Sequence, residues 1–290
     1  MQLLCHGAAL LDLLLEPYFI YLILRCSPPA MSTYRWYLLA ISFSNLILTV
    51  DYAVIWSPIV DTQGFDLCLP SSHLDDLYVH FLFVVFAVAL SAQWQILLIS
   101  LAYAVTVICW PLQARLFRST KFPIFLIPFV CLPSAIICPM IYILFTNNVC
   151  MNLSPRPASY PLIVTFTTYA LCYIIVSLYL LRKLGKSIRE RTSSTSTQSV
   201  TLVKIVRRNY LSLMVIMIAS DIAPTFLILG GFAFIRADFF RALMIFTVRY
   251  TSISACSYSW VATVVTIVFT TPYRTKTLQV LRSISALLPR

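Results

Sequence analysis

Seven long apolar runs, separated by polar or charged segments, set the pattern of the chain. Each approaches or exceeds the ~20 residues that a helix needs to cross the hydrocarbon core of a bilayer. The predicted spans are residues 3–24, 37–59, 77–110, 122–145, 161–181, 210–235 and 243–270. The third run is longer than one bilayer thickness, which predicts a tilted or projecting helix. The first contains Asp12, Glu16 and Pro17, but it lacks the basic segment of a removable signal peptide and is interpreted as a span.

The pattern changes after the last run. Pro272 ends the predicted span because it has no N–H to donate and its ring crowds the preceding turn. Apolar residues then recur at helical spacing, at Leu278, Leu281, Ile284, Leu287 and Leu288. Arg274, Lys276 and Arg282 are interspersed with them, which predicts a short amphipathic helix in the inner membrane interface; a frayed tail is the alternative. The chain thus divides into a seven-helix domain, residues 1–271, and a cytoplasmic tail, residues 272–290.

The composition supports a membrane assignment. Hydrophobic residues make up 60% of the 290 residues and charged residues only 11%, whereas a soluble domain carries about 25% charged residues. Such a chain has too little polar surface to cover a globule in water, so we predict an all-α transmembrane bundle in the lipid bilayer. The net charge of +11 does not indicate a nucleic acid partner, because the basic residues lie between apolar runs and form no groove with interleaved aromatic residues.

The distribution of basic residues predicts the orientation. By these boundaries, all Lys and Arg residues fall on one side of the membrane except Arg156, Arg236, Arg241 and Arg249. Cytoplasmic loops carry an excess of Lys and Arg. The N-terminus is therefore expected outside and the C-terminus in the cytoplasm.

Two features of the predicted outer loops agree with that direction. Cys68 lies just before the third span and Cys150 lies between the fourth and fifth spans. This placement suits a disulfide in an oxidising compartment, and two free thiols are the alternative. Asn152, in the triplet Asn152-Leu153-Ser154, is a candidate N-glycosylation site in an outer loop.

Three stretches carry a resemblance to a known family. They are residues 28–54, PPAMSTYRWYLLAISFSNLILTVDYAV, residues 193–228, SSTSTQSVTLVKIVRRNYLSLMVIMIASDIAPTFLI, and residues 254–274, SACSYSWVATVVTIVFTTPYR. These stretches resemble the nematode serpentine chemoreceptors of the Str superfamily, closest to the Srh and Sri groups. The resemblance lies in the Pro-x-x-Met and Trp-Tyr-Leu-Leu motifs before the second span, the Ser/Thr-rich segment before the sixth span and the Pro-Tyr-Arg motif at the end of the seventh. The chain has no Asp-Arg-Tyr after the third span and no Asn-Pro-x-x-Tyr in the seventh, so the rhodopsin-type activation switches are not carried over.

The resemblance implies a G-protein-coupled receptor with a seven-transmembrane helix bundle in the plasma membrane, with the sensory cilium as one candidate location. Such a receptor would bind a small odorant-like or pheromone-like molecule in the outer half of the bundle. The expected ligand-binding residues are His80, Phe83, Trp94, Tyr160, Phe166, Tyr169, Phe226 and Arg249. Aromatic walls with a few polar groups suit small, partly apolar ligands. Aromatic residues at helical spacing in a membrane bundle also commonly serve packing or face lipid.

On the inner side, the resemblance implies coupling to a heterotrimeric G protein. The expected coupling residues are basic: Arg115, Arg118, Arg182, Lys183, Lys204, Arg207, Arg208 and Arg274. Retention of positive charge in the cytoplasm and attraction to acidic headgroups account for the same residues. The Ser/Thr run at residues 193–197 is a candidate for phosphorylation, with a plain flexible linker as the alternative.

Charged residues within spans cost about 2.5–3.5 kcal/mol each on insertion scales and are often functional. Asp12, Glu16, Asp51, Asp221 and Arg249 lie within predicted spans. We expect an ion pair between Arg249 and either Asp51 or Asp221, because pairing reduces the cost of desolvation. Contact of Arg249 with an anionic ligand group and extension of its side chain to the interface are the alternatives.

Catalysis is not expected. The chain contains neither His-Glu-x-x-His nor Cys-x-x-Cys, and its three His residues lie near the outer side. No Lys lies within a predicted span, which excludes a retinal Schiff base, and we expect no cofactor and no metal. The alternative function is a membrane transporter or a ligand-gated channel subunit, although no convincing internal repeat of the kind many transporters have is present.

Overall fold

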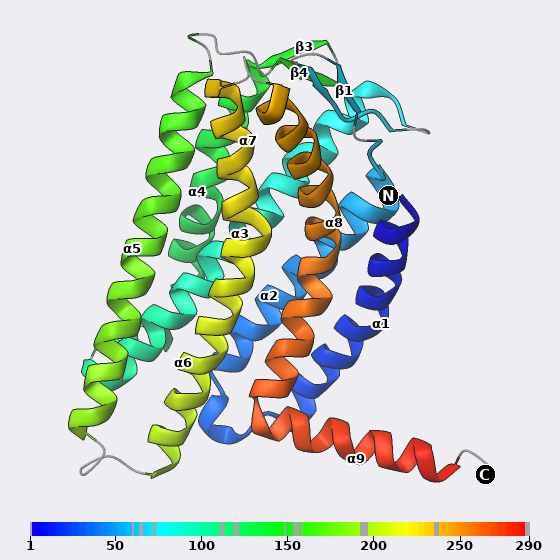
Figure 1. Cartoon of the computed structure of the whole chain (residues 1–290). Coiled ribbons are helices and arrows are strands. Elements are labelled where there is room, and N and C mark those ends of the chain that lie inside the picture. The colour runs from blue at the N-terminus through cyan, green and yellow to red at the C-terminus, as the bar shows by residue number, and fades with distance from the viewer. Residues whose placement is uncertain are drawn as a thin grey trace.

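In a bilayer the backbone finds no water to bond, so apolar segments of this length satisfy their N–H and C=O groups internally as helices. The computed structural model is a helical bundle with a small sheet at one end (Figure 1). It describes the whole chain except residues 1, 60, 64–65, 72–73, 111–112, 119–121, 148, 153–156, 158, 192–196, 235–237 and 288–290.

The helices include short 3-10 segments (η1, η3) and π-helical segments (η2, η4). In chain order they are α1 (Gln2–Cys26), η1 (Pro29–Met31), α2 (Tyr34–Thr49), η2 (Val50–Trp56), α3 (Asp76–Cys109), η3 (Gln113–Arg118), α4 (Phe122–Tyr142), α5 (Tyr160–Arg191), α6 (Thr197–Met217), η4 (Ile218–Ile222), α7 (Ala223–Phe234), α8 (Asp238–Phe269) and α9 (Thr271–Leu287). Among the described residues, six helices are long and apolar enough to cross a membrane: α1, α2 with η2, α3, α5, α6 with η4 and α7, and α8. The prediction of an all-α membrane bundle is confirmed to that extent.

The fourth predicted span corresponds to α4, which packs against α3 and α5 (Figure 1). Its apolar stretch, Leu126–Tyr142, is shorter than those of the six other helices. Pro128, Pro133 and Pro139 lie inside α4. Each proline removes one N–H from the helical ladder, so α4 relies on its neighbours for support. The helix ends at Tyr142, short of the predicted boundary at residue 145, because the chain there enters a strand.

The basic ends of α5 and α6 extend beyond the predicted spans. The sequence pattern placed a polar connection between residues 182 and 208, but α5 continues to Arg191 and α6 begins at Thr197. Hydropathy detects the apolar part of a helix and misses a polar continuation, because Lys and Arg are good helix formers. The two helices therefore project as a pair at the end of the bundle opposite the sheet (Figure 1).

Large apolar side chains cover the outward faces of the helices. Examples are Leu10, Leu14, Phe43, Ile127, Ile175, Tyr179, Val215, Phe246 and Val268. Soluble monomers rarely expose contiguous apolar patches larger than a few hundred Å². Lipid is the solvent that accommodates such a surface.

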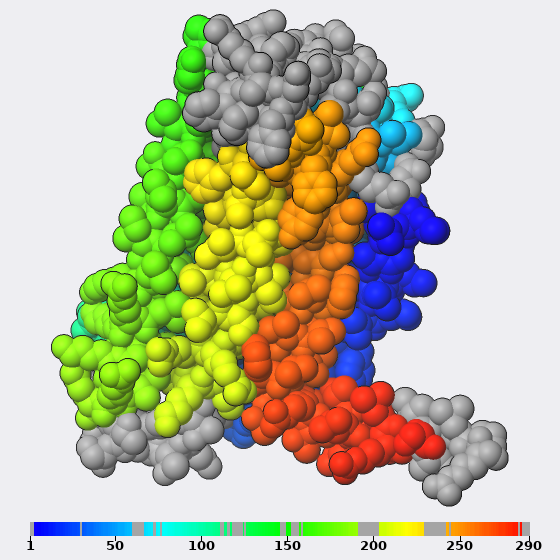
Figure 2. Space-filling view, in the orientation of Figure 1, coloured from blue at the N-terminus to red at the C-terminus, as the bar shows by residue number. Residues whose placement is uncertain are grey.

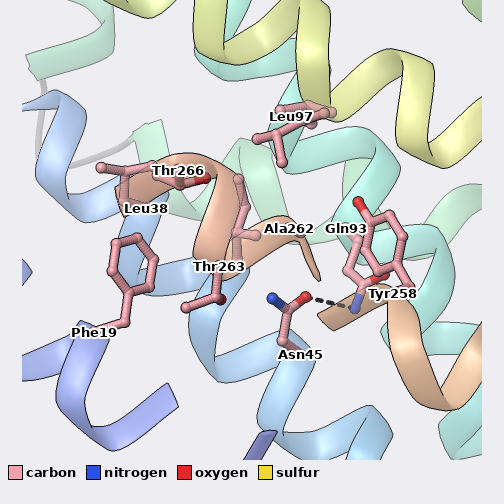
Figure 3. A pocket seen from close by; sticks show the side chains of 11 residues that line it. Phe19, Leu38, Asn45, Gln93, Leu97, Tyr258, Ala262, Thr263 and Thr266 are labelled. Carbon is pink, nitrogen blue, oxygen red and sulfur yellow. Dashed lines mark hydrogen bonds between the residues drawn. The ribbon is translucent and has the colours of Figure 1, made fainter. Parts of the chain in front are cut away.

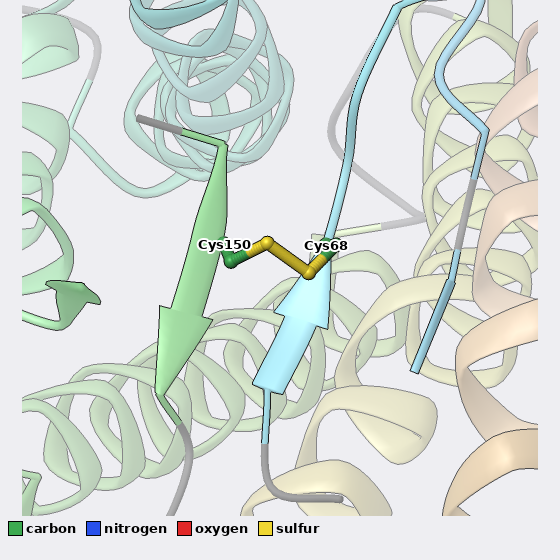
Figure 4. Close-up of a disulfide and its surroundings, with 2 residues drawn as sticks. All are labelled: Cys68 and Cys150. Atoms are coloured by element: carbon green, nitrogen blue, oxygen red, sulfur yellow. A yellow bond between two sulfur atoms is a disulfide. The ribbon is translucent and has the colours of Figure 1, made fainter. Parts of the chain in front are cut away.

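A four-stranded antiparallel sheet, which was not predicted, covers one end of the bundle. Its strands are β1 (Asp61–Gln63), β2 (Asp66–Cys68), β3 (Phe145–Asn147) and β4 (Cys150–Asn152), in the order β1-β2-β4-β3. Cys68 and Cys150 are paired in register on β2 and β4 and form a disulfide (Figure 4). This is the pair expected from their positions in the sequence. The bond ties the segment before α3 to the segment after α4.

At the opposite end, α9 lies across the foot of the bundle instead of continuing α8 (Figures 1 and 2). Tyr273 anchors it: the side chain is fully buried, and its hydroxyl lies 2.7 Å from the Ser27 hydroxyl beyond α1. Burial raises the pKa of Tyr273 to about 12. Leu278 and Leu281 are exposed, so the bundle leaves an apolar strip of α9 uncovered. The tail therefore forms the amphipathic helix that its spacing predicted.

Replacing Cys68 by Ser should lower the stability of the folded bundle by about 2–4 kcal/mol, because the disulfide restricts the unfolded chain. The thermal midpoint of the full chain in detergent measures the loss. Cys172, a free and exposed cysteine of α5, supplies the matched control, and Cys172→Ser should leave the midpoint unchanged. The double variant Cys68→Ser/Cys150→Ser should match Cys68→Ser, and a midpoint for Cys68→Ser equal to that of the control would contradict the prediction.

Candidate functional site

A cavity of about 310 Å³ lies between α3, α4, α5 and the η4–α7 segment, in the half of the bundle next to the sheet. Ligand pockets typically measure about 300–1,000 Å³, so this one suits a small molecule. Leu67 of β2 and Met151 of β4 close it on the side of the sheet. The lining is mostly apolar and aromatic, with polar groups at Ser91, Trp94, Ser134, Tyr169, Asp221 and Thr225.

One face of α3 supplies much of the wall. The lining residues of α3 are Phe83, Phe86, Ala87, Leu90, Ser91 and Trp94, which recur every three or four positions and so share a face of the helix. The Trp94 ring stacks on the Tyr169 ring of α5, with centroids 5.8 Å apart. Gln95 Nε2 donates a hydrogen bond of 2.9 Å to the Tyr169 hydroxyl. These contacts fix the aromatic wall between α3 and α5.

Asp221 joins the lining from η4. Pro224, in the next turn, has no N–H, so the Ser220 carbonyl loses its usual helical partner and the backbone widens into a π-helix over Ile218–Ile222. Such π-helical turns rotate the following side chains and occur frequently at functional sites. Asp221 is 8% exposed, and its Oδ2 has no hydrogen-bond partner among the described residues.

The structure brings together half of the predicted ligand residues. Phe83, Trp94, Phe166 and Tyr169 line the cavity. His80 lies outside the lining, where it packs against Phe145 with ring centroids 5.0 Å apart. Phe226 packs behind Phe166 at 6.1 Å. Tyr160 is 57% exposed at the start of α5 and points away from the bundle interior.

The expected ion pair of Arg249 with Asp51 or Asp221 is not formed. Arg249 is exposed on α8, on the same outward face as Phe246 and Tyr250, whereas Asp51 is 4% exposed and Asp221 is 8% exposed. The rotation of α8 thus turns the guanidinium away from both carboxylates and from the cavity. This placement fits the alternative of a long side chain that extends along the outer surface.

A second polar cluster lies on α1, where the sequence pattern showed two charged residues within a predicted span but gave no partners for them. Asp12 and Glu16, one helical turn apart on the same face, are both fully buried. Thr49 of α2 and Ser259 of α8 each donate a hydrogen bond of 2.5 Å to Asp12. Glu16 accepts hydrogen bonds from Ser42 and Asn45 of α2 and from Thr263 of α8, and the Ser259 hydroxyl oxygen also lies 3.1 Å from Glu16 Oε1. The two carboxyl groups therefore join α1, α2 and α8.

This cluster continues to α3. Gln93 Nε2 donates a hydrogen bond of 2.8 Å to Asn45 Oδ1 (Figure 3). A cavity of only about 10 Å³ lies beside these groups, lined also by Thr263 and Tyr258. That volume is close to the room that one water molecule needs. The cluster is a structural junction and does not offer space for an organic ligand.

The predicted coupling residues gather at the end of the bundle away from the sheet. Exposed basic side chains there are Arg182, Lys204, Arg207 and Arg274. Two others have contacts within the bundle. Arg208 donates a hydrogen bond of 2.9 Å to the Phe269 carbonyl of α8, and the Lys183 ammonium lies 3.6 Å from the centroid of the Trp110 ring.

Some predicted residues lie outside what the structure describes. The side chains of Arg115 and Arg118 in η3 and of Asn152 in β4 belong to this group, as do residues 193–196 of the Ser/Thr run. No protein-family model and no curated protein matches the chain. The functional assignment therefore depends on the geometry and the sequence pattern.

Replacing Ser259 by Ala should destabilise the bundle by about 1–3 kcal/mol, because the buried Asp12 carboxyl loses a hydrogen-bond donor. Ser212 of α6 is the matched control, since its hydroxyl bonds the Arg208 carbonyl of its own helix and no other group of the described residues. Thermal unfolding in detergent should show a lower midpoint for Ser259→Ala than for Ser212→Ala. Equal midpoints would mean that the Asp12 cluster does not hold α1 to α8.

Proposed function

We propose that the protein is a chemosensory receptor of the G-protein-coupled type with seven membrane crossings. The cavity of about 310 Å³ carries this proposal, because it offers an aromatic site for a small odorant-like or pheromone-like molecule. The seventh crossing is α4. Its 21 residues, at a rise of about 1.5 Å each, reach about 30 Å, the thickness of the hydrocarbon core.

The end that carries the sheet faces outside in this proposal. The disulfide Cys68–Cys150 lies at that end, and such bonds persist in oxidising compartments. The opposite end carries the basic helix ends and α9, and positive charge is retained on the cytoplasmic side. The exposed Leu278 and Leu281 of α9 suit the inner membrane interface.

Signalling would follow from two packings of the same helices. A ligand in the cavity favours one packing over the other only by its difference in affinity for the two. The π-helical turn η4, followed by Pro224, interrupts the regular α-helical hydrogen bonds between α6 and α7. A change of angle there would move the basic end of α6, which we propose to contact a heterotrimeric G protein together with the end of α5.

The orientation predicts where the two ends of the chain are accessible. An epitope at the N-terminus should bind antibody on intact cells, and an epitope at the C-terminus should bind it only after permeabilisation. This outcome requires an odd number of crossings with the N-terminus outside. Both epitopes on one side of the membrane would contradict seven crossings and the receptor proposal with them.

Filling the cavity should abolish responses. Leu90→Trp adds volume to the lining on α3, whereas Leu171→Trp makes the same change at a half-exposed position of α5 outside the lining. In cells that carry a calcium or cAMP reporter, an odorant from a volatile-compound panel that activates the wild type should fail on Leu90→Trp and act normally on Leu171→Trp. Surface labelling controls for expression. A full response from Leu90→Trp at normal expression would place the ligand elsewhere.

A further inference from the structure

We propose that the cavity binds a protonated amine with a compact apolar or aromatic body, and that Asp221 is its counter-ion. The inference deepens the proposed function, since it assigns a ligand class to the same cavity. It begins with the charge of the lining. Asp221 is a carboxylate, and no Lys, Arg or His of the described residues lines the cavity.

No positively charged side chain of the described residues pairs with this carboxyl group. Ser220 and Trp94 offer it hydrogen-bond donors, but neither carries a charge. Oδ2 has no hydrogen-bond partner among the described residues, although a buried acceptor without a partner is costly. The one cation expected to approach it, Arg249, is exposed on α8. A cationic ligand would supply the missing charge and the missing donor together.

The other walls favour the same class of ligand. Aromatic rings of α3 and α5 surround the space next to Asp221, namely Phe83, Phe86, Trp94, Phe166 and Tyr169. A ring face attracts a cation within about 6 Å of its centroid, and more strongly where water is excluded. The same rings provide apolar contact for the body of the ligand. An anion would meet an uncompensated carboxylate, and a neutral molecule could at most donate a hydrogen bond to Oδ2 without supplying a compensating charge.

Asp221 differs from the other buried acidic residues in its hydrogen-bond partners or in its position relative to the cavity. Asp12 and Glu16 are surrounded by hydroxyl and amide donors of α2 and α8. Asp51 resembles Asp221 closely, because it also lies in a π-helical segment, is buried and has an Oδ2 without a partner among the described residues. Asp51 does not line the cavity. It therefore supplies a matched control for the loss of a buried carboxylate.

The test measures binding without a G protein. The full chain is purified in detergent, and its thermal midpoint is recorded with 2-phenylethylamine, with the neutral 2-phenylethanol and with the anionic 3-phenylpropionate. Ligands that bind the folded state raise the midpoint. We expect a rise with the amine and a smaller rise or none with the other two probes.

The variants locate the effect. Asp221→Asn should weaken amine binding about 10- to 100-fold, the loss expected for a hydrogen bond to a charged group. Asp51→Asn should bind the amine as the wild type does. The comparison of amine with alcohol on the wild type decides the proposal even where Asp221→Asn does not fold. Equal stabilisation by the alcohol, amine binding unchanged in Asp221→Asn, or no stabilisation by the amine at millimolar concentration would each overturn it.

Failure of this inference is distinct from failure of the proposed function. Amine binding that depends on Asp221, with no reporter response in cells, would support the site and count against signalling. A reporter response to neutral odorants, lost in Leu90→Trp and accompanied by no amine binding, would support the receptor and overturn the amine site.

Discussion

The burial of Asp12 and Glu16 on one face of α1 constrains the helices around them. A carboxyl group in an apolar interior costs several kcal/mol unless donors surround it, and α2 and α8 supply those donors from Thr49, Ser259 and Thr263, among others. The donors must point inward at the same depth, so the cluster fixes the rotation of α1, α2 and α8 about their axes. Through Asn45, the same cluster reaches α3. One side of the bundle is thereby closed and polar in its core, with room for no more than about one water.

The other side of the bundle is built differently. Helix α4 contains three prolines, and the α6–η4–α7 rod contains Pro224 and a π-helical turn. The cavity lies between these irregular helices and α3 and α5. Asp221 lies on this side, and its Oδ2 has no hydrogen-bond partner among the described residues, whereas Asp12 accepts hydrogen bonds from Thr49 and Ser259. An aspartate is thus part of a structural junction on one side and, as we propose, a recognition group on the other.

Local patterns in the sequence predicted what depends on local chemistry. Apolar runs located the six long helices, and the spacing of leucines after Pro272 predicted α9. The sheet was missed because its strands are three residues each and pair across the chain through Cys68 and Cys150. The ion pair predicted for Arg249 is not formed, because the sequence pattern did not show how α8 is rotated about its axis. That rotation places Arg249 on the outer surface. Half of the predicted ligand residues line the cavity, whereas the contribution of α4 was missed because a helix that is apolar all round gives no sign of which face is buried.

The α6–η4–α7 rod connects the cavity with the basic end of the bundle, which is where the proposed mechanism begins and ends. Asp221 lies in its π-helical turn, while Arg207 and Arg208 lie on its basic end. A Cβ atom at Gly185 of α5 would approach the Arg207 guanidinium carbon to 3.2 Å, and Arg208 bonds the Phe269 carbonyl just before Tyr273 anchors α9. Movement of the rod would therefore disturb its contacts with α5 and α8 together. The buried carboxyl cluster holds α1, α2 and α8 together, so we expect these three helices to keep their positions. A ligand at Asp221 would then move α5 and α6 relative to them.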